Sequence, residues 1–182
     1  SVDVEPLKGK VKHHEYLHLK KTDPRREVAT RLIAVCGKVG TITVWNKTFE
    51  QSRIREMANA LPDLADALTA LNDRMVDLED IFKGKYLYHH DLQGSSSIKY
   101  VLPFLCPDLD YSRLEINNGS ESQAQYTCLM ERRYNKTTSK KVITQLLEYN
   151  NLDTLAMLRV LRKIKSILAK ALTVPEEIMV VS

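Results

Sequence analysis

The sequence predicts a single α/β domain with a small sheet and a helix-rich C-terminal half. Its 182 residues suit one domain with a proper hydrophobic core. The expected elements run hairpin, helix, strand and then mostly helices, which is an order typical of α/β or α+β proteins. Hydrophobic residues make up 43% and charged residues 27%, as in ordinary globular chains. We therefore expect one domain over residues 1–172 and a C-terminal tail over residues 173–182.

The first elements follow from alternation and from turn-forming residues. Val2 and Val4 alternate with polar residues, and a glycine-containing turn separates them from a second alternating stretch, so residues 2–19 predict a β-hairpin. Pro24 and the apolar spacing after it predict a helix over residues 24–37. The run Thr-Ile-Thr-Val-Trp at residues 41–45 predicts a short strand in the middle of a sheet.

Helical spacing governs most of the remaining chain. One helix is expected to end at Leu61, before Pro62, and further helices are expected over residues 64–71, 98–105 and 121–134. A long helical region is expected from a cap at residues 137–139 to Leu168. Residues 84–95 predict a loop, and residues 106–119 predict an irregular connection.

Composition excludes several classes of protein. No apolar run approaches the ~18 residues of a membrane span, and no signal segment opens the chain, so we expect a cytoplasmic protein. Three widely spaced cysteines provide neither a disulfide framework nor a zinc knuckle. The net charge is +4, and the lysines and arginines occur in clusters. Such clusters suit a nucleic-acid backbone, although solvated helix faces produce the same pattern.

The first candidate site follows the strand at residues 41–45. A carboxylate just beyond a buried strand lies where open α/β sheets bind ligands, so Glu50 is a candidate ligand for Mg²⁺ or Mn²⁺. Asn46 would orient backbone or substrate through its amide, and Phe49 would anchor the helix start in the core. The alternative is structural: Asn46 caps the helix, and Glu50 in its first turn complements the helix dipole.

The second candidate site lies late in the chain. Tyr149 and Asp153 are four positions apart, so on a helix they share a face. A carboxylate so placed binds a metal ion, while the phenol positions or deprotonates the attacking water. In the alternative interpretation, Tyr149 packs in the core and Asp153 caps a helix that follows Asn150 and Asn151.

Together and in this order, the two segments resemble a known pattern. Asn46-Lys47-Thr48-Phe49-Glu50 and Tyr149-Asn150-Asn151-Leu152-Asp153 resemble motifs two and three of the DEDD-type 3′–5′ exonucleases, in the tyrosine-bearing subclass. Over nearly its whole length the chain also resembles a bacterial domain of unknown function distantly related to those enzymes. The most specific segments of that likeness are Ser97 to Pro103 and Asp153 to Met157.

The resemblance implies an RNase H-like fold, with a small central mixed sheet flanked by helices. It also implies hydrolysis of single-stranded nucleic-acid ends, DNA or RNA, with Mg²⁺ or Mn²⁺. Glu50 and Asp153 would bind the metal, Tyr149 would orient the water and Asn46 would position the loop or substrate. Lys99, at a helix N-terminus, is a candidate phosphate contact, and Asp77 is a candidate third metal ligand or a helix cap.

The chain departs from the exonuclease pattern at two places. The acid of motif two is Glu50, where those enzymes usually carry Asp. Asp3-Val4-Glu5 has the Asp-x-Glu form of motif one, but the resemblance aligns residues 1–4 with the second strand of the family. We therefore expect the first strand to lie outside this chain, which leaves half of a two-metal centre and little activity. The rival hypothesis is a non-catalytic module that binds nucleic acid or a protein partner, or an interaction domain within a larger chain.

Histidines and exposed tyrosines complete the candidates. His13 and His14, like His89 and His90, are adjacent pairs, and on a strand such neighbours point to opposite faces, which argues against a shared metal. Tyr86 and Tyr88 would either stack on bases or anchor their loop.

Overall fold

The computed structural model describes residues 2–4 and 10–172, with the side chains of residues 10–170. The N-terminal half contains β1 (Val2–Val4), β2 (Lys12–His14), α1 (Arg25–Cys36), β3 (Ile42–Val44), α2 (Lys47–Ala60), α3 (Ala65–Asp73) and β4 (Met75–Asp77). The C-terminal half contains α4 (Asp80–Lys83), α5 (Ile98–Leu105), α6 (Gly119–Met130) and α7 (Lys136–Leu172). Short 3₁₀ turns, η1 (Pro62–Leu64), η2 (His90–Leu92) and η3 (Tyr111–Arg113), connect them.

The strands form two separate two-stranded sheets among the described residues. β1 pairs with β2 in an antiparallel register with Asp3 opposite His13. β3 pairs with β4 in a parallel register with Val44 opposite Asp77. Hydrogen bonds from Ile42 N to the Arg74 carbonyl and from Leu78 N to the Val44 carbonyl extend the second pair at its two ends.

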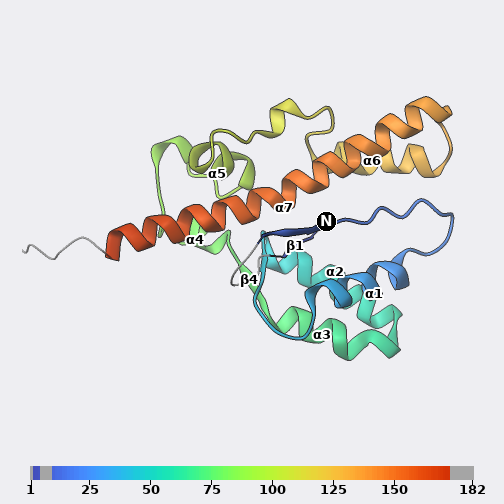
Figure 1. Ribbon diagram of the computed structural model, residues 1–182, viewed down its shortest axis with the longest axis horizontal. Helices are drawn as coiled ribbons and strands as arrows, with labels where there is room; N and C mark the ends of the chain where they lie inside the picture. The colour runs from blue at the N-terminus through green and yellow to red at the C-terminus, as the bar shows by residue number, and fades with distance from the viewer. Residues whose placement is uncertain (1, 5–9, 173–182) are drawn as a thin grey trace, which may run out of the picture.

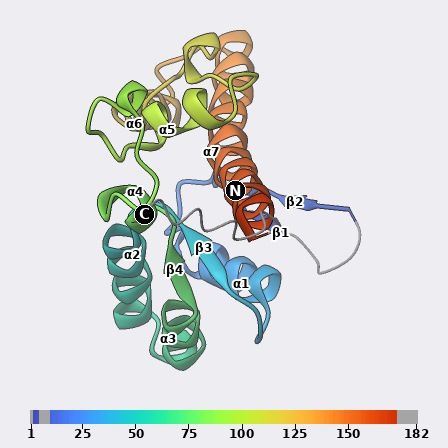
Figure 2. The same ribbon diagram turned by 90° about the vertical axis from the view of Figure 1, so that its left-hand side faces the viewer.

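Helix α7 runs along the molecule and holds its two halves together (Figure 1). It packs against α5 and α6 on one side and contacts β1. The other half is the β3–β4 pair with α1, α2 and α3 around it, below α7 in the turned view (Figure 2). The two halves therefore meet near α7, β1 and the end of β3.

The buried apolar side chains fall into three clusters. One surrounds the β3–β4 pair and includes Ala29, Val44 and Leu68. A second lies between α5 and the C-terminal part of α7 and includes Val101, Ala156 and Val160. The third, around Ile116, Val142 and Leu146, lies under α6. Tyr149 packs against both the second and the third clusters, which places it at their junction.

Most local expectations are confirmed. The hairpin, the helix from residue 24, the strand at 41–45, the break at Pro62 and the helix over 98–105 all occur, with shifts of a few residues. The expected helix over 121–134 lies at Gly119–Met130 instead. It begins at Gly119 because the Asn118 side-chain oxygen accepts from Glu121 N at 2.9 Å and caps the helix there. The turn of the hairpin and the tail over residues 173–182 lie outside the described residues.

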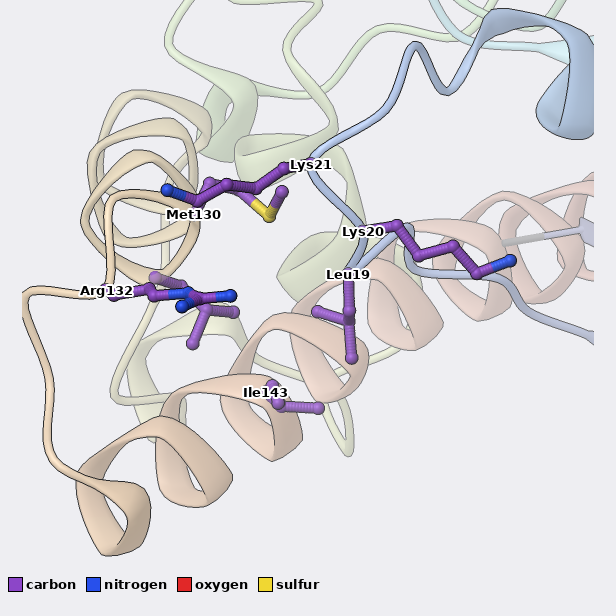
Figure 3. Close-up of a pocket in the computed structure, with 7 residues that line it drawn as sticks. Leu19, Lys20, Lys21, Met130, Arg132 and Ile143 are labelled. Atoms are coloured by element: carbon purple, nitrogen blue, oxygen red, sulfur yellow. The ribbon is translucent and has the colours of Figure 1, made fainter.

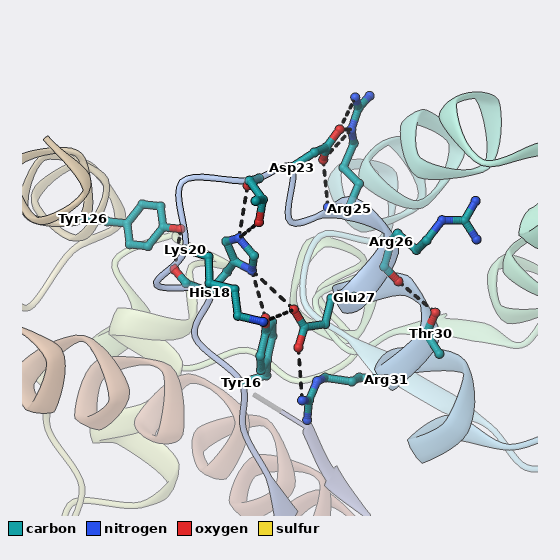
Figure 4. Close-up of polar contacts among 11 residues, drawn as sticks. Tyr16, His18, Lys20, Asp23, Arg25, Arg26, Glu27, Thr30, Arg31 and Tyr126 are labelled. Carbon is teal, nitrogen blue, oxygen red and sulfur yellow. Dashed lines mark hydrogen bonds and ion pairs between the residues drawn. The ribbon is translucent and has the colours of Figure 1, made fainter.

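One local expectation in the N-terminal half is wrong. The segment after His14 does not continue as a strand to residue 19. Its His18 ring is buried, 2.9 Å from the Tyr16 hydroxyl and 3.0 Å from the Thr22 carbonyl oxygen, and the Tyr126 hydroxyl donates to the His18 carbonyl (Figure 4). These side-chain contacts fix the segment in an irregular path against α6.

The long helical region expected as far as Leu168 is confirmed, and Asn150 and Asn151 do not interrupt it. α7 is continuous through both positions, and Asn150 Nδ2 donates to the Leu146 carbonyl within it at 2.8 Å. Asp153 therefore lies in the interior of the helix and is not its cap.

The architecture agrees with the coarse α/β class that the sequence predicts, with many helices and few strands. The described strands do not form one central mixed sheet, so the RNase H-like fold stays a prediction. Met75–Asp77 is a strand that the sequence analysis did not predict.

Candidate functional site

The junction of β3 and α2 is built by one asparagine and one aspartate. Asn46 adopts a left-handed conformation with φ of 65°, and its side-chain oxygen accepts from Phe49 N at 3.3 Å. Asparagine tolerates this conformation better than most residues and is a strong N-cap. The structural alternative for Asn46 is therefore confirmed: it begins α2 and turns the chain out of the sheet.

Asp77 fixes the same turn from the neighbouring strand. Its Oδ1 accepts from Asn46 N at 3.1 Å and from Glu79 N at 3.0 Å, and its Oδ2 accepts from Lys47 N at 2.7 Å. Both carboxylate oxygens are thus occupied by backbone amides. Asp77 thus caps the start of α2, which is the cap role that the sequence left open.

Glu50 lies one turn further along α2 and is half-buried. Burial raises the pKa of its carboxyl, and the nearby charge of Asp153 raises it further. Glu50 and Asp153 come from α2 and α7, which are far apart in the sequence, and the fold brings their charges within interacting range. Phe49, in contrast, is 55% exposed with the Arg53 guanidinium 5.4 Å from its ring centroid, so the expectation that it anchors the core is wrong.

Asp153 is held by two tyrosines. The Tyr111 hydroxyl donates to Asp153 Oδ1 at 2.8 Å, and the Tyr149 hydroxyl donates to the same carboxyl from one turn earlier on α7. Burial raises the pKa of Asp153, and the two phenol hydrogen bonds partly oppose that shift because they stabilise the ionised form. The shared face of Tyr149 and Asp153 that their spacing predicts is thus present.

Both phenols remain protonated at neutral pH. Burial raises the pKa of Tyr149 to about 12, and the charge of Asp153 and the hydrogen bond to it act in the same direction. Burial also raises the pKa of Tyr111, which is 5% exposed. Tyr149 is therefore equipped to donate a hydrogen bond and not to deprotonate a water molecule.

Lys99 and Gly119 border the same carboxyl group. Lys99, exposed in the first turn of α5, lowers the pKa of Asp153 by its charge, and its ammonium lies 6.0 Å from the centroid of the Tyr111 ring. A Cβ atom at Gly119 would lie 4.0 Å from the Tyr149 hydroxyl, so the first turn of α6 is also near. A cation and two phenols thus lie around Asp153, whose charge also acts on Glu50.

The structure brings together most of the site residues that the sequence suggested. Glu50, Tyr149, Asp153 and Lys99 converge, and Asn46 and Asp77 shape the turn beside them. Glu5 lies outside the described residues, and Asp3 is described by its backbone alone, in β1. Tyr111 was missed, because nothing in the irregular segment around it marks a residue that contacts α7.

A basic hollow lies near the other end of α7. It has a volume of about 320 Å³ and lies between the segment after His18, the end of α6 and Ile143 of α7. Lys21 and Arg132 point into it over an apolar floor of Leu129, Met130 and Ile143, while Lys20 points away (Figure 3). Within the described part of the chain, neither Lys21 nor Arg132 has a carboxylate partner.

No helix in the described part of the chain is long and apolar enough to cross a membrane.

Fold and site together define a helix-rich α/β domain whose half-buried carboxylate pair is formed by α2 and α7. The chain belongs to the family described as domain of unknown function DUF2779, whose model matches residues 1–97. The match includes Glu50 and Asp77 and ends before Lys99, Tyr149 and Asp153.

Two bacterial relatives extend the comparison beyond residue 97. The chain is 28% identical over 141 residues to the uncharacterized protein MG366 of Mycoplasma genitalium, which covers 71% of this chain and 21% of the relative. It is 28% identical over 148 residues to the homologue of that protein in Mycoplasma pneumoniae, covering 72% and 22%. The chain thus spans about one fifth of the length of these relatives. No solved structure matches it.

Proposed function

We propose that this chain forms part of a metal-dependent nuclease domain of the DEDD exonuclease type, acting on the ends of single-stranded nucleic acid. The observation that carries the proposal is the convergence of Glu50 and Asp153. Burial raises the pKa of both carboxyls, and the charge of Asp153 raises that of Glu50 further, so a cation between them would stabilise both in the ionised form. Oxygen ligands of this kind favour Mg²⁺ or Mn²⁺.

Each neighbouring residue has a role in this proposal. Glu50 and Asp153 would hold the ion, which would polarise a phosphodiester and activate water when bound. Tyr149, protonated at neutral pH, would orient that water by donating a hydrogen bond. Lys99 would contact a phosphate oxygen of the substrate. Asp77, whose oxygens already accept three backbone amides, would fix the turn and not bind the ion.

Two carboxylates are few for a two-metal site, and this bears on activity. In the RNase H-like arrangement that we propose, a strand carrying Asp-x-Glu would lie between β1 and β3. Such a strand would join an antiparallel pair and a parallel pair into one mixed sheet, and it would add two carboxylates next to Glu50. We therefore expect this chain alone to hydrolyse nucleic acid weakly or not at all.

The test uses this chain and a form extended at its N-terminus into the parent protein. Each is incubated with an end-labelled single-stranded oligonucleotide and Mn²⁺, and products are resolved by gel. We expect the extended form to shorten the strand from its 3′ end, and Asp153→Asn or Glu50→Gln to slow it by at least about a hundredfold. Glu148→Gln, an exposed change on the same helix, is the matched control and should retain full activity.

No cleavage by the extended form, or cleavage that Asp153→Asn does not affect, would reject the nuclease proposal.

The second candidate is a non-catalytic module that binds nucleic acid, and the basic hollow of Lys21 and Arg132 favours it. If neither form cleaves, binding of the oligonucleotide that weakens with salt and is reduced in Lys21→Gln/Arg132→Gln would support the module. Lys38→Gln, an exposed lysine between α1 and β3, is the control for that measurement.

A further inference from the structure

The turn η2 brings two histidines and an aspartate together outside the site of Glu50 and Asp153. The expectation that His89 and His90 point to opposite faces is wrong, because they lie at a 3₁₀ turn and not on a strand. Their ring centroids are 4.2 Å apart. Among the described residues, His89, His90 and Asp91 form a group whose ligand atoms all lie within 4.8 Å of one another.

The three side chains of this group lie close enough together to reach one metal ion. His89 Nδ1 is 3.3 Å from Asp91 Oδ2, and His90 Nε2 is 3.0 Å from Asp91 Oδ1. In a tetrahedral zinc site with bonds of about 2.0–2.1 Å, neighbouring ligand atoms are about 3.3 Å apart. Each imidazole therefore lies next to a different oxygen of the Asp91 carboxylate, at about the separation of neighbouring ligands of one ion.

The backbone holds this turn in place before any ion binds. Leu92 is 2% exposed and fixes the turn to the core between α5 and α7. Leu92 N donates to the His89 carbonyl at 3.1 Å, and Gln93 N donates to the His90 carbonyl at 2.9 Å. The His89 ring stacks on Phe104 of α5, with centroids 4.7 Å apart and planes 24° apart. One imidazole is thus positioned by packing, which reduces the ordering cost of binding.

We propose that His89, His90 and Asp91 bind a divalent transition-metal ion of the zinc class, with water completing the coordination. Two imidazole nitrogens and a carboxylate suit Zn²⁺. Mg²⁺ prefers oxygen ligands, so it should bind this group poorly. In the free protein, Asp91 N donates to His89 Nδ1 at 3.3 Å, a long and weak hydrogen bond that coordination through Nδ1 would replace. This proposal does not depend on the proposed nuclease function.

The test is a titration of the full chain with Zn²⁺, followed by calorimetry and by imidazole ¹H–¹⁵N NMR spectra. We expect binding of one ion that shifts the ring nitrogens of His89 and His90 and leaves those of His14 unchanged. His90→Gln and Asp91→Asn should each weaken Zn²⁺ binding by at least about tenfold. His14→Gln, in β2, is the matched control and should bind as the parent does.

Two further measurements separate this site from the carboxylate pair. Zn²⁺ binding at the turn should persist in Asp153→Asn and in the presence of excess Mg²⁺. No binding of Zn²⁺, binding unchanged in His89→Gln/His90→Gln, or NMR shifts confined to other histidines would each overturn the proposal. The NMR result on the unmodified chain stands even where a variant fails to fold.

Discussion

Asp77, at the end of β4, and Asp153, inside α7, are two half-buried aspartates whose surroundings differ in kind. Asp77 accepts three backbone amides, so its charge is balanced by groups that the fold itself fixes. Within the described part of the chain, Asp153 accepts from the hydroxyls of Tyr111 and Tyr149. Its pKa is raised because the effect of burial is larger than the opposite effect of those hydrogen bonds. The difference separates a carboxylate that holds the chain from one whose charge remains available for a ligand.

The largest expected effect is the loss of stability when Asp77 is replaced. Asp77→Ala removes the acceptor of Asn46 N, Lys47 N and Glu79 N together, and it should lower the free energy of unfolding by about 3 kcal/mol. Asp153→Asn should change it by less than about 1 kcal/mol, because a costly buried charge is lost along with its hydrogen bonds. Chemical denaturation of both variants measures this, with the exposed Asp80→Ala as control. Equal losses for the two aspartates would remove the distinction between them.

A smaller effect concerns charge at the candidate site. The pKa values of Glu50 and Asp153 are raised in the folded state, so both carboxyls bind protons more tightly when the chain is folded. This difference stabilises the folded chain fully below the unfolded pKa of about 4. The stabilisation is lost as the pH rises through the pKa values of the folded state. Stability measured between pH 4 and pH 7 should therefore decline less in Glu50→Gln/Asp153→Asn than in the parent chain.

Mn²⁺ should oppose that loss at neutral pH. At ten times its dissociation constant, an ion that binds only the folded chain adds about 1.4 kcal/mol, or about 3–6 °C in Tm. Thermal unfolding with and without Mn²⁺ measures the gain, which should vanish in the double variant Glu50→Gln/Asp153→Asn. A Mn²⁺-dependent gain that survives in this variant would place the ion elsewhere.

Local sequence patterns predicted one side of the site and missed the other. The cap at Asn46 and the shared face of Tyr149 and Asp153 depend only on neighbours within one turn, which spacing reveals. Tyr111 reaches Asp153 across 42 positions from an irregular segment, and no periodicity marks such a contact. The paired histidines were misjudged for a related reason, since the direction of adjacent side chains depends on whether the backbone is a strand or a turn.

The smallest expected effect distinguishes the two phenols. Tyr111→Phe removes a hydrogen bond of 2.8 Å to Asp153, so the pKa of Asp153 should rise further, and the free energy of unfolding at pH 7 should fall by about 1 kcal/mol. Tyr149→Phe should raise the same pKa but also slow hydrolysis by the extended protein, because only Tyr149 is proposed to orient the water. Carboxyl ¹³C NMR titration measures the pKa in each variant, with Tyr100→Phe on α5 as the control. If both variants slowed hydrolysis equally, the assigned role of Tyr149 would be wrong, and the two tyrosines would serve Asp153 alone.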